Sequence, residues 1–402
     1  MESLRTTCCI VGGGPAGMML GFLLARKGVE VMVLEKHKDF FRDFRGDTVH
    51  PSTLEVLHEL GILDQFLALP HQEIRQIGAS IGGEDFAIAD TTHLPTHAKF
   101  VALMPQWDFL NFLARQAANY PNFTLKMEHN VTDLVEGNGR VEGVRAETPN
   151  GPVEIRAGLV VGCDGRHSTS RAAAHLRVAD HGVPIDVLWF RLSKHASDPA
   201  AALGNVNYGA LIVLIDRGDY YQTAFIIAKG TFETAVKPAG LEAFHAHIVR
   251  IAPFLADRVT ELTDWGQVKL LSVQVNRLKR WHLRGLLCIG DAAHAMSPVG
   301  GIGINLAIQD AVAAANILAA PLAGNGPVTE LTLAHVQSRR EFPTRVTQSF
   351  QVLVHHFLGK VLDNPGPIEP PRLLKLLRPG PWLQNKLARF IGLGVRPEHV
   401  RN

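Results

Sequence analysis

The sequence predicts an α/β fold that combines a Rossmann-like domain, an inserted mainly β domain and a C-terminal helical segment. Three observations predict it: a glycine-rich turn between a β-rich run and an apolar helical run near the N-terminus, two later buried strands that each end in a turn with Gly and Asp, and a series of strand-like runs between those two turns. With 402 residues, of which 46% are hydrophobic and 19% charged, the chain can bury a large core. Its net charge of +2 gives no reason to expect nucleic-acid binding.

The first element is a strand–turn–helix–strand unit. Thr6–Val11 is rich in β-branched and apolar residues, and it leads into the turn Gly12–Gly17, a helical run to about Lys27, and a second strand at Val31–Leu34. The turn has the spacing GxGxxG, and Glu35 closes the second strand. This order of elements is typical of the βαβ unit that binds dinucleotides.

Each residue type in this turn has a physical reason. Gly12 permits the tight turn, Gly14 lets the backbone approach a pyrophosphate, and Gly17 lets the helix and the strand pack closely. Pro15 suits the first helical turn, whose free N–H groups and partial positive charge attract an anion. The carboxylate of Glu35 favours a free ribose 2′-hydroxyl, as in FAD or NAD, over a 2′-phosphate. The alternative is a glycine-rich turn that holds no ligand.

An uncharged stretch from Cys8 to Ala25 has the length of a membrane span, but its glycines and proline would interrupt a membrane helix. The cysteines Cys8, Cys9, Cys163 and Cys288 form no CxxC motif. They predict buried thiols in a reducing compartment rather than a disulfide framework or a zinc site. We therefore expect a cytoplasmic protein without a bound metal.

Two later segments each contain a buried strand that ends in a turn with Gly and Asp. Counted after the glycine-rich turn, the second turn is Asp164-Gly165 and the third is Gly290-Asp291. The chain continues from the third turn through a Pro/Gly-rich loop at 298–303 into a long Ala-rich helix. Asp291 would reach the carboxyl edge of the sheet and accept a hydrogen bond from a sugar hydroxyl. The loop would offer backbone N–H groups to the negative N1/O2 edge of a reduced flavin. One such turn alone is more often an Asp that caps a helix, whereas three elements in this order favour a bound dinucleotide.

With these three turns, the chain resembles the group A flavoprotein monooxygenases, the para-hydroxybenzoate hydroxylase family of FAD-dependent aromatic hydroxylases. The resemblance covers about residues 5–320 and is strongest at 8–60, 98–115, 158–172 and 285–312. It implies a noncovalently bound FAD, to which Arg45 and Gln106 contribute as the family's characteristic Arg and Gln. The positions implied to bind FAD are Gly12, Gly14, Pro15, Ala16, Gly17, Glu35, Lys36, Arg45, Gln106, Asp164, Gly290, Asp291, Pro298, Gly301, Gly303, Ile304 and Asn305.

The resemblance also implies a reaction. NADH or NADPH would bind transiently near Asp164 and Arg166 as the reductant, and O2 would be used to hydroxylate an aromatic or conjugated small molecule through a flavin C4a-hydroperoxide. Ile302 stands where the best-known member has a lysine, so electrostatic help for an anionic phenol or flavin would be weaker or come from elsewhere. Two alternatives stay open: a reductase or dehydrogenase of the same fold, and a flavin-bearing protein that binds a ligand without turnover.

The expected FAD-binding domain is discontinuous and comprises residues 1–75, 98–178 and 277–340. Residues 76–97 and 179–276 form the expected β domain, whose sheet would cover the flavin and hold the substrate. Its strands are expected at Val187–Leu192, Asn207–Ile215, Tyr220–Ala228 and Val268–Val275. The oligomeric state is left open.

Candidate substrate contacts lie on these strands, and candidate catalytic residues lie in the loop before the Ala-rich helix. The strand candidates are Trp189, Arg191, Tyr208, Tyr221 and Gln222, although an aromatic residue on a strand more often belongs to a core. By resemblance, Pro298, Gly300 and Gly301 border the flavin and the substrate. His294 is a tempting general base because imidazole titrates near neutral pH, but packing beside the Gly290-Asp291 turn is the more common role.

Residues 341–402 form the expected C-terminal helical segment. Within it, residues 370–402 contain seven lysine and arginine residues and one acid, interleaved with leucines. Such a basic amphipathic segment can contact a membrane surface or a partner, but it more often packs on its own protein with the basic residues in water. Pro343 lies inside a helical run from about Thr329 to Leu362, where the helix should start afresh or kink.

Overall fold

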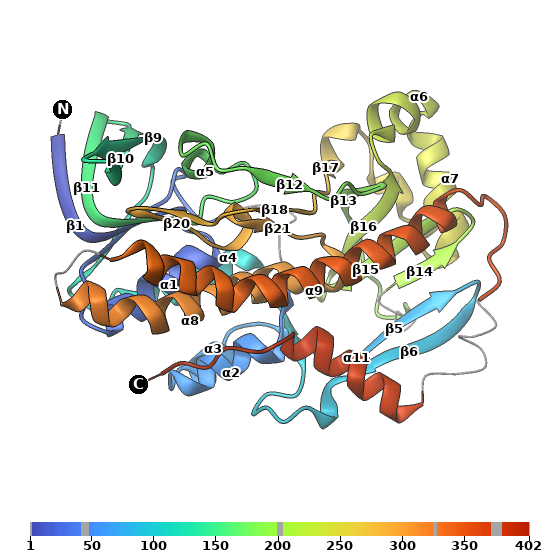
Figure 1. Cartoon of the computed structure of the whole chain (residues 1–402). Coiled ribbons are helices and arrows are strands. Elements are labelled where there is room, and N and C mark those ends of the chain that lie inside the picture. Colours follow the sequence, from blue (N-terminus) through green and yellow to red (C-terminus); the bar gives the residue numbers. More distant parts are fainter. Residues whose placement is uncertain (1, 42–47, 199–203, 325–327, 371–379, 402) are drawn as a thin grey trace.

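A computed structural model describes residues 2–41, 48–198, 204–324, 328–370 and 380–401, and two large sheets organise them (Figure 1). The first sheet has eight strands. Along its main path they are β19 (His282–Leu283), β20 (Leu286–Cys288), β11 (Gly151–Gly162), β1 (Glu2–Val11), β2 (Val31–Leu34) and β8 (Phe123–Lys126), and β10 (Arg140–Thr148) and β9 (Asn130–Gly137) extend it beside β11.

The predicted N-terminal βαβ unit is confirmed. Strands β1 and β2 are parallel neighbours, joined by helix α1 (Pro15–Arg26). On its other side β1 pairs in parallel with β11, which pairs in parallel with β20. Strand β11, which leads into the Asp164-Gly165 turn, is continuous over 12 residues. Because all these strands point the same way, their carboxyl ends meet at one edge.

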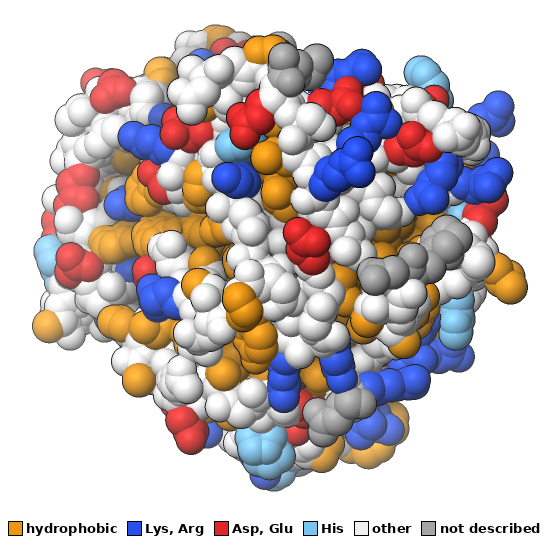
Figure 2. Space-filling model, turned by 90° about the vertical axis from the view of Figure 1, so that its left-hand side faces the viewer, with side chains coloured by type: hydrophobic (Ala, Val, Ile, Leu, Met, Phe, Trp, Pro, Cys, Tyr) orange, Lys and Arg blue, Asp and Glu red, His pale blue; other side chains and the backbone are white. Residues whose placement is uncertain are grey.

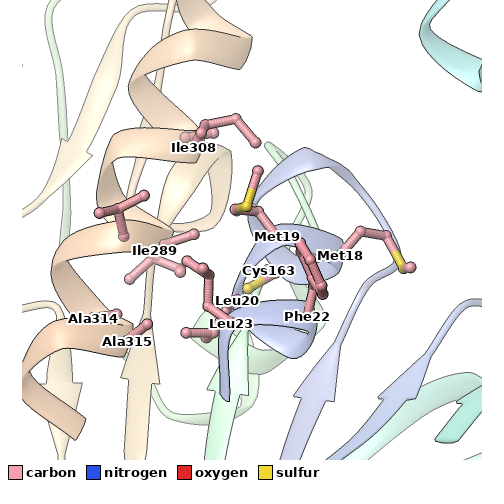
Figure 3. Packing of buried hydrophobic residues seen from close by; sticks show 14 of the residues in the cluster. Met18, Met19, Leu20, Phe22, Leu23, Cys163, Ile289, Ile308, Ala314 and Ala315 are labelled. Carbon is pink, nitrogen blue, oxygen red and sulfur yellow. The ribbon is translucent and has the colours of Figure 1, made fainter. Parts of the chain in front are cut away.

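Two helices pack face to face beside this sheet. The first is α1, and the second is α8 (Ile302–Ala323), the long Ala-rich helix that the sequence predicts. Figure 3 shows Leu20 and Leu23 of α1 beside Ala314 and Ala315 of α8, with small side chains allowing a close approach. Among the described residues, α8 with the turn before it is the one helix long and apolar enough to cross a membrane, and most of it is buried in this core.

The second sheet has seven strands and brings together the two sequence ranges of the expected β domain. Its order is β17 (Lys269–Leu271), β13 (Ile185–Ser193), β16 (Tyr220–Ala228), β15 (Ala210–Asp216), β14 (Gly204–Asn207), β5 (Gln76–Ile81) and β6 (Glu84–Asp90). One face packs against helix α7 (Leu241–Ile251). The opposite face, which we call the inner face, packs against β7 (Val101–Leu103) of the first domain and against helix α9 (Glu330–Leu362). The domain boundaries themselves stay a prediction.

Three expectations for the β domain are wrong in detail. Asn207–Ile215 is not one strand but the hairpin β14–β15, because Tyr208 and Gly209 adopt φ values of 48° and 70° and reverse the chain. Only Lys269–Leu271 is a strand within the run expected at Val268–Val275. Helix α7 and several short helical turns interrupt a region expected to be largely β.

Smaller elements complete the fold. Two three-stranded sheets consist of β3 (Thr48–Val49), β7 and β4 (Gln72–Ile74), and of β12 (Val178–Asp180), β18 (Asn276–Leu278) and β21 (His294–Ala295). The remaining α-helices described are α2 (Pro51–Glu59), α3 (Leu63–Leu67), α4 (Gln106–Ala117), α5 (Thr169–Ala173), α6 (Lys237–Ala239) and α11 (Pro381–Leu393). On the face shown in Figure 2, charged side chains of both signs are scattered among apolar ones.

The C-terminal segment packs on the rest of the chain. Helix α9 is a single helix through Pro343, so the fresh start expected there is wrong. Helix α11 packs on β6, and its Ala388 and Leu393 are buried against Leu94. The leucines at 373, 374, 376 and 377 lie outside the described residues. A contact of this segment with a membrane or a partner stays a prediction.

Candidate active site

The three turns that the sequence singles out meet at one edge of the eight-stranded sheet. Val11, Gly162 and Cys288 are register partners at the ends of β1, β11 and β20. A Cβ on Gly12 would lie 2.5 Å from the carbonyl oxygen of Cys163, so the first and second turns touch. A Cβ on Gly290 would lie 3.1 Å from the Cβ of Ala16, so the third turn touches the start of α1. The turns therefore surround one site.

The glycine-rich turn leaves space where a ligand would bind. Gly12 has a φ of 103°, which an L side chain rarely adopts, and a Cβ on Gly17 would overlap the carbonyl oxygen of Gly12. Gly14 differs, because its φ is −72° and a Cβ there would meet no described atom within 4 Å. No described side chain caps α1, so its first N–H groups face this open space. The arrangement fits a pyrophosphate at the helix N-terminus.

Glu35 is buried at the end of β2 and holds the turn. Its Oε2 accepts a hydrogen bond from the Gly13 N–H at 3.0 Å, and its Oε1 accepts one from the His37 N–H at 3.1 Å. Lys36 beside it is exposed. The carboxylate thus lies next to the turn, as the role of a ribose-binding acid requires.

The two aspartates of the later turns have different surroundings. Asp164 accepts hydrogen bonds from the Ser168 hydroxyl at 2.5 Å and from the Ser170 N–H at 2.9 Å, so it organises the turn that enters α5. The side chain of Asp291 is 31% exposed, and its Oδ2 lies 3.4 Å from Nη2 of Arg166. Arg166 also has a buried Nη1 without a partner among the described residues. Asp291 and Arg166 are therefore available to a sugar hydroxyl and an anion.

The start of α8 is anchored to residues 48–53, which form β3 and the beginning of α2. Thr48 donates a hydrogen bond from its hydroxyl to the Gly301 carbonyl oxygen at 2.9 Å, and a Cβ on Gly301 would overlap that hydroxyl. Asn305 is buried, and its Oδ1 accepts hydrogen bonds from the His50 N–H at 2.8 Å and the Thr53 hydroxyl at 2.7 Å. The Asn305 side chain thus supports the loop through protein contacts.

His294 packs beside the third turn, which is the common role of such a histidine. It is 1% exposed, and its Nε2 lies 2.5 Å from Oδ2 of Asp310. The other carboxylate oxygen of Asp310 accepts a hydrogen bond from Arg340 at 2.9 Å. Burial alone would raise the pKa of Asp310, but His294 and Arg340 lower it below its usual range. The Asp310 carboxylate also fixes the Gly290 N–H, which donates to its Oδ2 at 3.1 Å.

The remaining predicted FAD-binding positions lie at the start of α4, in the loop before α8 and at the start of α8. Gln106 begins α4, three residues after Leu103, the register partner of Thr48. Pro298 precedes the turn in which Gly300 and Gly301 adopt φ values of 78° and 61°. Gly303 and Ile304 lie in the first turn of α8. Arg45 lies outside the described residues.

The predicted substrate contacts fall on both faces of the seven-stranded sheet. Trp189, Arg191 and Gln222 lie on the inner face, because register pairs Trp189 with Ala224 and Arg191 with Gln222. Tyr221 is buried on the opposite face, in the cluster that packs on α7. Tyr208 lies at the β14–β15 turn, where the Arg250 guanidinium of α7 stacks 4.3 Å from its ring centre. The structure thus brings three of the five candidates together.

Several residues that support the loop before α8 from elsewhere in the chain were not predicted. Thr48 is one, and Gln351 and His355 of α9, which contact Ser297, are others. A polar stripe inside the predicted helix at 329–362 was the available signal. The four cysteines are buried and free, and burial raises the pKa of Cys8 to about 12 and that of Cys163 well above its usual range. Among the described residues, no cluster could hold a metal ion.

Comparison with known proteins agrees with this geometry. The family described as FAD binding domain matches residues 5–349. A 6-methylpretetramide 4-monooxygenase from Streptomyces rimosus is 31% identical over 361 residues, which cover 88% of this chain and 84% of the relative. A rifampicin monooxygenase from Streptomyces venezuelae is 28% identical over 381 residues, which cover 91% of this chain and 74% of the relative.

The fold is also that of a solved structure. The anhydrotetracycline hydroxylase OxyS from Streptomyces rimosus superposes with a TM-score of 0.75 at 23% identity, covering 98% of this chain and 77% of that one. The family match spans most of the chain, and the three turns of the FAD site meet at one edge. The chain therefore belongs to the FAD-binding-domain family of FAD-dependent aromatic monooxygenases and is a flavoprotein oxidoreductase.

Proposed function

We propose that the chain hydroxylates a neutral, largely apolar aromatic molecule bound between the loop at 298–301 and the inner face of the seven-stranded sheet. One observation carries this proposal. The three turns that fit FAD lie at one sheet edge, and Val299, in the loop that continues from the third turn, packs in the same apolar cluster as Trp189 of the inner face. A guest between them would lie next to the flavin.

Residues of this chain would hold the cofactor from both ends. Gly14 and the first N–H groups of α1 would bind the pyrophosphate, Glu35 the ribose of the adenosine half, and Asp291 a hydroxyl of the ribityl chain. Backbone N–H groups of the loop and of the α8 start, around Gly301 and Gly303, would face the flavin edge. When bound, FAD supplies hydride acceptance from NAD(P)H and the activation of O2.

The inner face indicates what kind of substrate fits. Val213 and Ile215 pack around Trp189, and they offer an apolar wall. The indole Nε1 of Trp189 is buried and has no hydrogen-bond partner among the described residues. A buried donor without a partner costs free energy, about 1–3 kcal/mol, that a ligand acceptor can recover. We therefore infer that the substrate carries a carbonyl or hydroxyl oxygen that accepts from Trp189.

Two further residues of the inner face would set the polar rim. Gln222 is buried, and its side-chain amide donates a long hydrogen bond, 3.4 Å, to the Phe190 carbonyl oxygen. Arg191 stacks on the Tyr220 ring, 5.0 Å from its centre. Tyr221 and Tyr208 lie away from this face, so neither enters the proposal.

The test measures oxygen use together with product. Purified protein is incubated with NADH or NADPH and a panel of aromatic compounds that includes 6-methylpretetramide, anhydrotetracycline and rifampicin, which appear in the names of relatives. We expect substrate-stimulated NAD(P)H oxidation and a product heavier by one oxygen atom, labelled from ¹⁸O2. NAD(P)H oxidation with reduced product and no label would indicate a reductase. Ligand binding without NAD(P)H oxidation across the panel would indicate a binding protein.

We also propose that the protein acts in the cytoplasm. The support is indirect: its four cysteines are free and buried, and its long apolar helix α8 is packed in the core.

A further inference from the structure

Helix α9 carries a buried stripe of polar side chains. Arg340, Thr344, Gln348, Gln351 and His355 follow one another at spacings of three or four residues, which place them on one face of the helix. Each is at most 1% exposed. A buried helix face is ordinarily apolar, and buried polar groups need hydrogen-bond partners. Each of these five side chains therefore needs a hydrogen-bond partner inside the protein.

The N-terminal part of the stripe binds α8 and the strands β18 and β21, which lie before and after the third turn in the sequence. Arg340 contacts Asp310, which in turn accepts from the Gly290 N–H. Gln348 donates to the carbonyl oxygens of Asn276 at 2.8 Å and Ala295 at 3.2 Å. These contacts fix β18 and β21 to the helix.

The C-terminal part of the stripe binds the loop itself. The Oε1 of Gln351 accepts a hydrogen bond from the Ser297 N–H at 3.1 Å, and its Nε2 donates to the carbonyl oxygens of Ser297 at 3.0 Å and Val299 at 3.1 Å. The Ser297 hydroxyl lies 2.7 Å from Nε2 of His355 and accepts from the Val299 N–H at 3.2 Å. Gln351 thus binds the backbone on both sides of Pro298, and His355 holds the Ser297 hydroxyl that accepts from the Val299 N–H.

The same stretch of α9 also packs on the inner face. Val354, Leu358 and Leu362 share an apolar cluster with Val299 and Trp189. One rigid helix therefore contacts both the loop that faces the flavin and the sheet that faces the substrate. Figure 1 shows α9 running from beside α8 to the region of β15.

We propose that Gln351 and His355 are positioning residues that set where the loop at 297–301 lies relative to FAD and to the inner face. This inference rests on the proposed function only for its catalytic consequence; the placement of the loop can be measured without a substrate. Small displacements of reacting groups have large effects, since about 1 Å can cost about 100-fold in rate.

The protonation of His355 agrees with this role. Burial, with a smaller contribution from His356, lowers the pKa of His355 to about 4, so the ring is neutral near pH 7. Because the Val299 N–H donates to the Ser297 hydroxyl oxygen, the hydroxyl hydrogen is free to be donated to Nε2 of His355.

The decisive variant is Gln351→Met, which keeps the length of the side chain and removes its three hydrogen bonds. Gln337→Met is the matched control, because Gln337 lies on the same helix and also binds backbone, accepting from the Trp281 N–H at 2.9 Å and donating to the Lys279 carbonyl oxygen at 3.1 Å. Gln337 is far along α9 from the loop. Ser297→Ala is a milder second variant, which removes only the hydroxyl between His355 and Val299.

The measurements use the FAD-loaded protein. We expect amide hydrogen exchange in residues 290–301 to accelerate about tenfold or more in Gln351→Met, because about 1.4 kcal/mol of lost hydrogen bonding corresponds to a factor of ten. We also expect a change in the visible flavin spectrum and in the flavin midpoint potential, with a smaller change in the same direction for Ser297→Ala. Gln337→Met should leave exchange in 290–301, the spectrum and the potential at wild-type values.

The outcomes separate this inference from the proposed function. Unchanged exchange, spectrum and potential in both Gln351→Met and Ser297→Ala would overturn the positioning role, even if the wild type hydroxylates a substrate. If Gln351→Met does not fold, the Ser297→Ala result decides. A wild type that binds FAD but hydroxylates nothing would contradict the proposed function and leave the loop measurement valid. Where a substrate is known, more hydrogen peroxide per NAD(P)H in Gln351→Met than in Gln337→Met is the expected catalytic consequence.

Discussion

Gly14 and Gly17 lie three residues apart, yet adding a side chain to each should have different effects. Gly14 has an ordinary φ of −72° and open space around its missing Cβ, so Gly14→Val should leave the melting temperature of the FAD-free protein near the wild-type value. The new side chain would occupy the place of the pyrophosphate, so FAD affinity should fall about 100-fold or more, that is by roughly 3 kcal/mol. Fluorescence titration with FAD measures it.

Gly17→Val is the counterpart. Its Cβ would overlap the Gly12 carbonyl oxygen, so helix and strand must separate, at a cost of about 3 kcal/mol in the free energy of unfolding. Chemical denaturation of both variants without FAD tests the contrast. Equal FAD affinity in Gly14→Val and the wild type would show that the open space beside Gly14 is not the cofactor site.

Which residue roles the sequence could predict depends on how local their causes are. The steric roles of Gly12 and Gly17 follow from the turn itself, and the structure has both. Asp164 and Asp291 look alike in sequence, because each lies beside a glycine at the end of a buried strand. Only the fold shows that Ser168 and Ser170 hydrogen-bond Asp164, whereas the side chain of Asp291 stays partly exposed. Trp189 and Tyr221 were equal candidates until the register assigned them to opposite faces.

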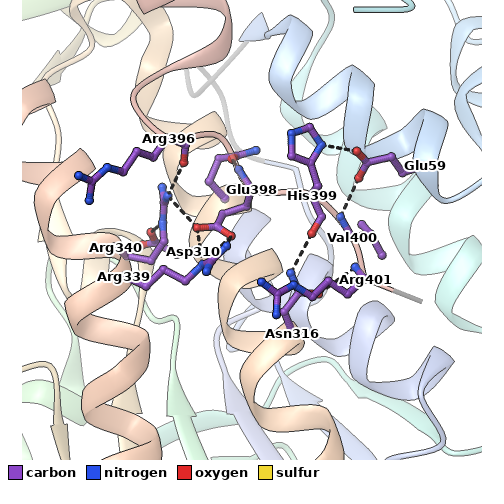
Figure 4. A network of polar contacts seen from close by, with 11 residues as sticks. Glu59, Asp310, Asn316, Arg339, Arg340, Arg396, Glu398, His399, Val400 and Arg401 are labelled. Carbon is purple, nitrogen blue, oxygen red and sulfur yellow. Dashed lines mark hydrogen bonds and ion pairs between the residues drawn. The ribbon is translucent and has the colours of Figure 1, made fainter.

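At the scale of elements, the chain end after α11 is held by a buried ion-pair network (Figure 4). Glu398 is 3% exposed and pairs with Arg339 at 2.7 Å and with the buried Arg340 at 3.5 Å. Arg340 also binds Asp310 beneath the third turn. The end of the chain is thereby linked to the support of the FAD site.

Glu398→Ala should therefore destabilise the protein. The buried Arg340 keeps its pair with Asp310 but loses Glu398, and the half-buried Arg339 loses its carboxylate partner, at a cost of about 1–3 kcal/mol in the free energy of unfolding. Thermal unfolding of the variant, beside the exposed-site control Glu369→Ala, measures the effect. A melting temperature equal to that of Glu369→Ala would mean that the pairs of Glu398 contribute nothing to stability.

Elements with strong local signals were predicted well, and those set by distant contacts were not. The βαβ unit and β16 agree with their predicted ranges. The hairpin at Tyr208 was missed because a tyrosine gives no local signal for a turn with positive φ. The turn is held instead by a distant contact, since the segment 364–368 packs against it and Asn207 accepts a hydrogen bond from the Ile368 N–H. Helix α9 continues through Pro343 although proline tends to end a helix. Its neighbours Arg340 and Thr344 are fully buried, and this tertiary packing outweighs the local preference of proline.

At the scale of the molecule, two bodies share one interface. The eight-stranded sheet supplies three turns at one edge, the seven-stranded sheet supplies an inner face, and α9 contacts both. The sequence predicts the two sheets because each has its own local pattern. It could not predict that α9 connects them, since Gln351 and Ser297 are 54 residues apart and nothing local relates them.

The most direct test is an experimental structure of the purified protein with FAD. The account predicts one noncovalent FAD per chain, with its pyrophosphate at Gly14, a ribityl hydroxyl on Asp291, and its ring between the loop at 298–301 and Trp189. A cofactor that contacts Gly14 but lies away from Asp291, or a chain that takes up no FAD, would contradict it.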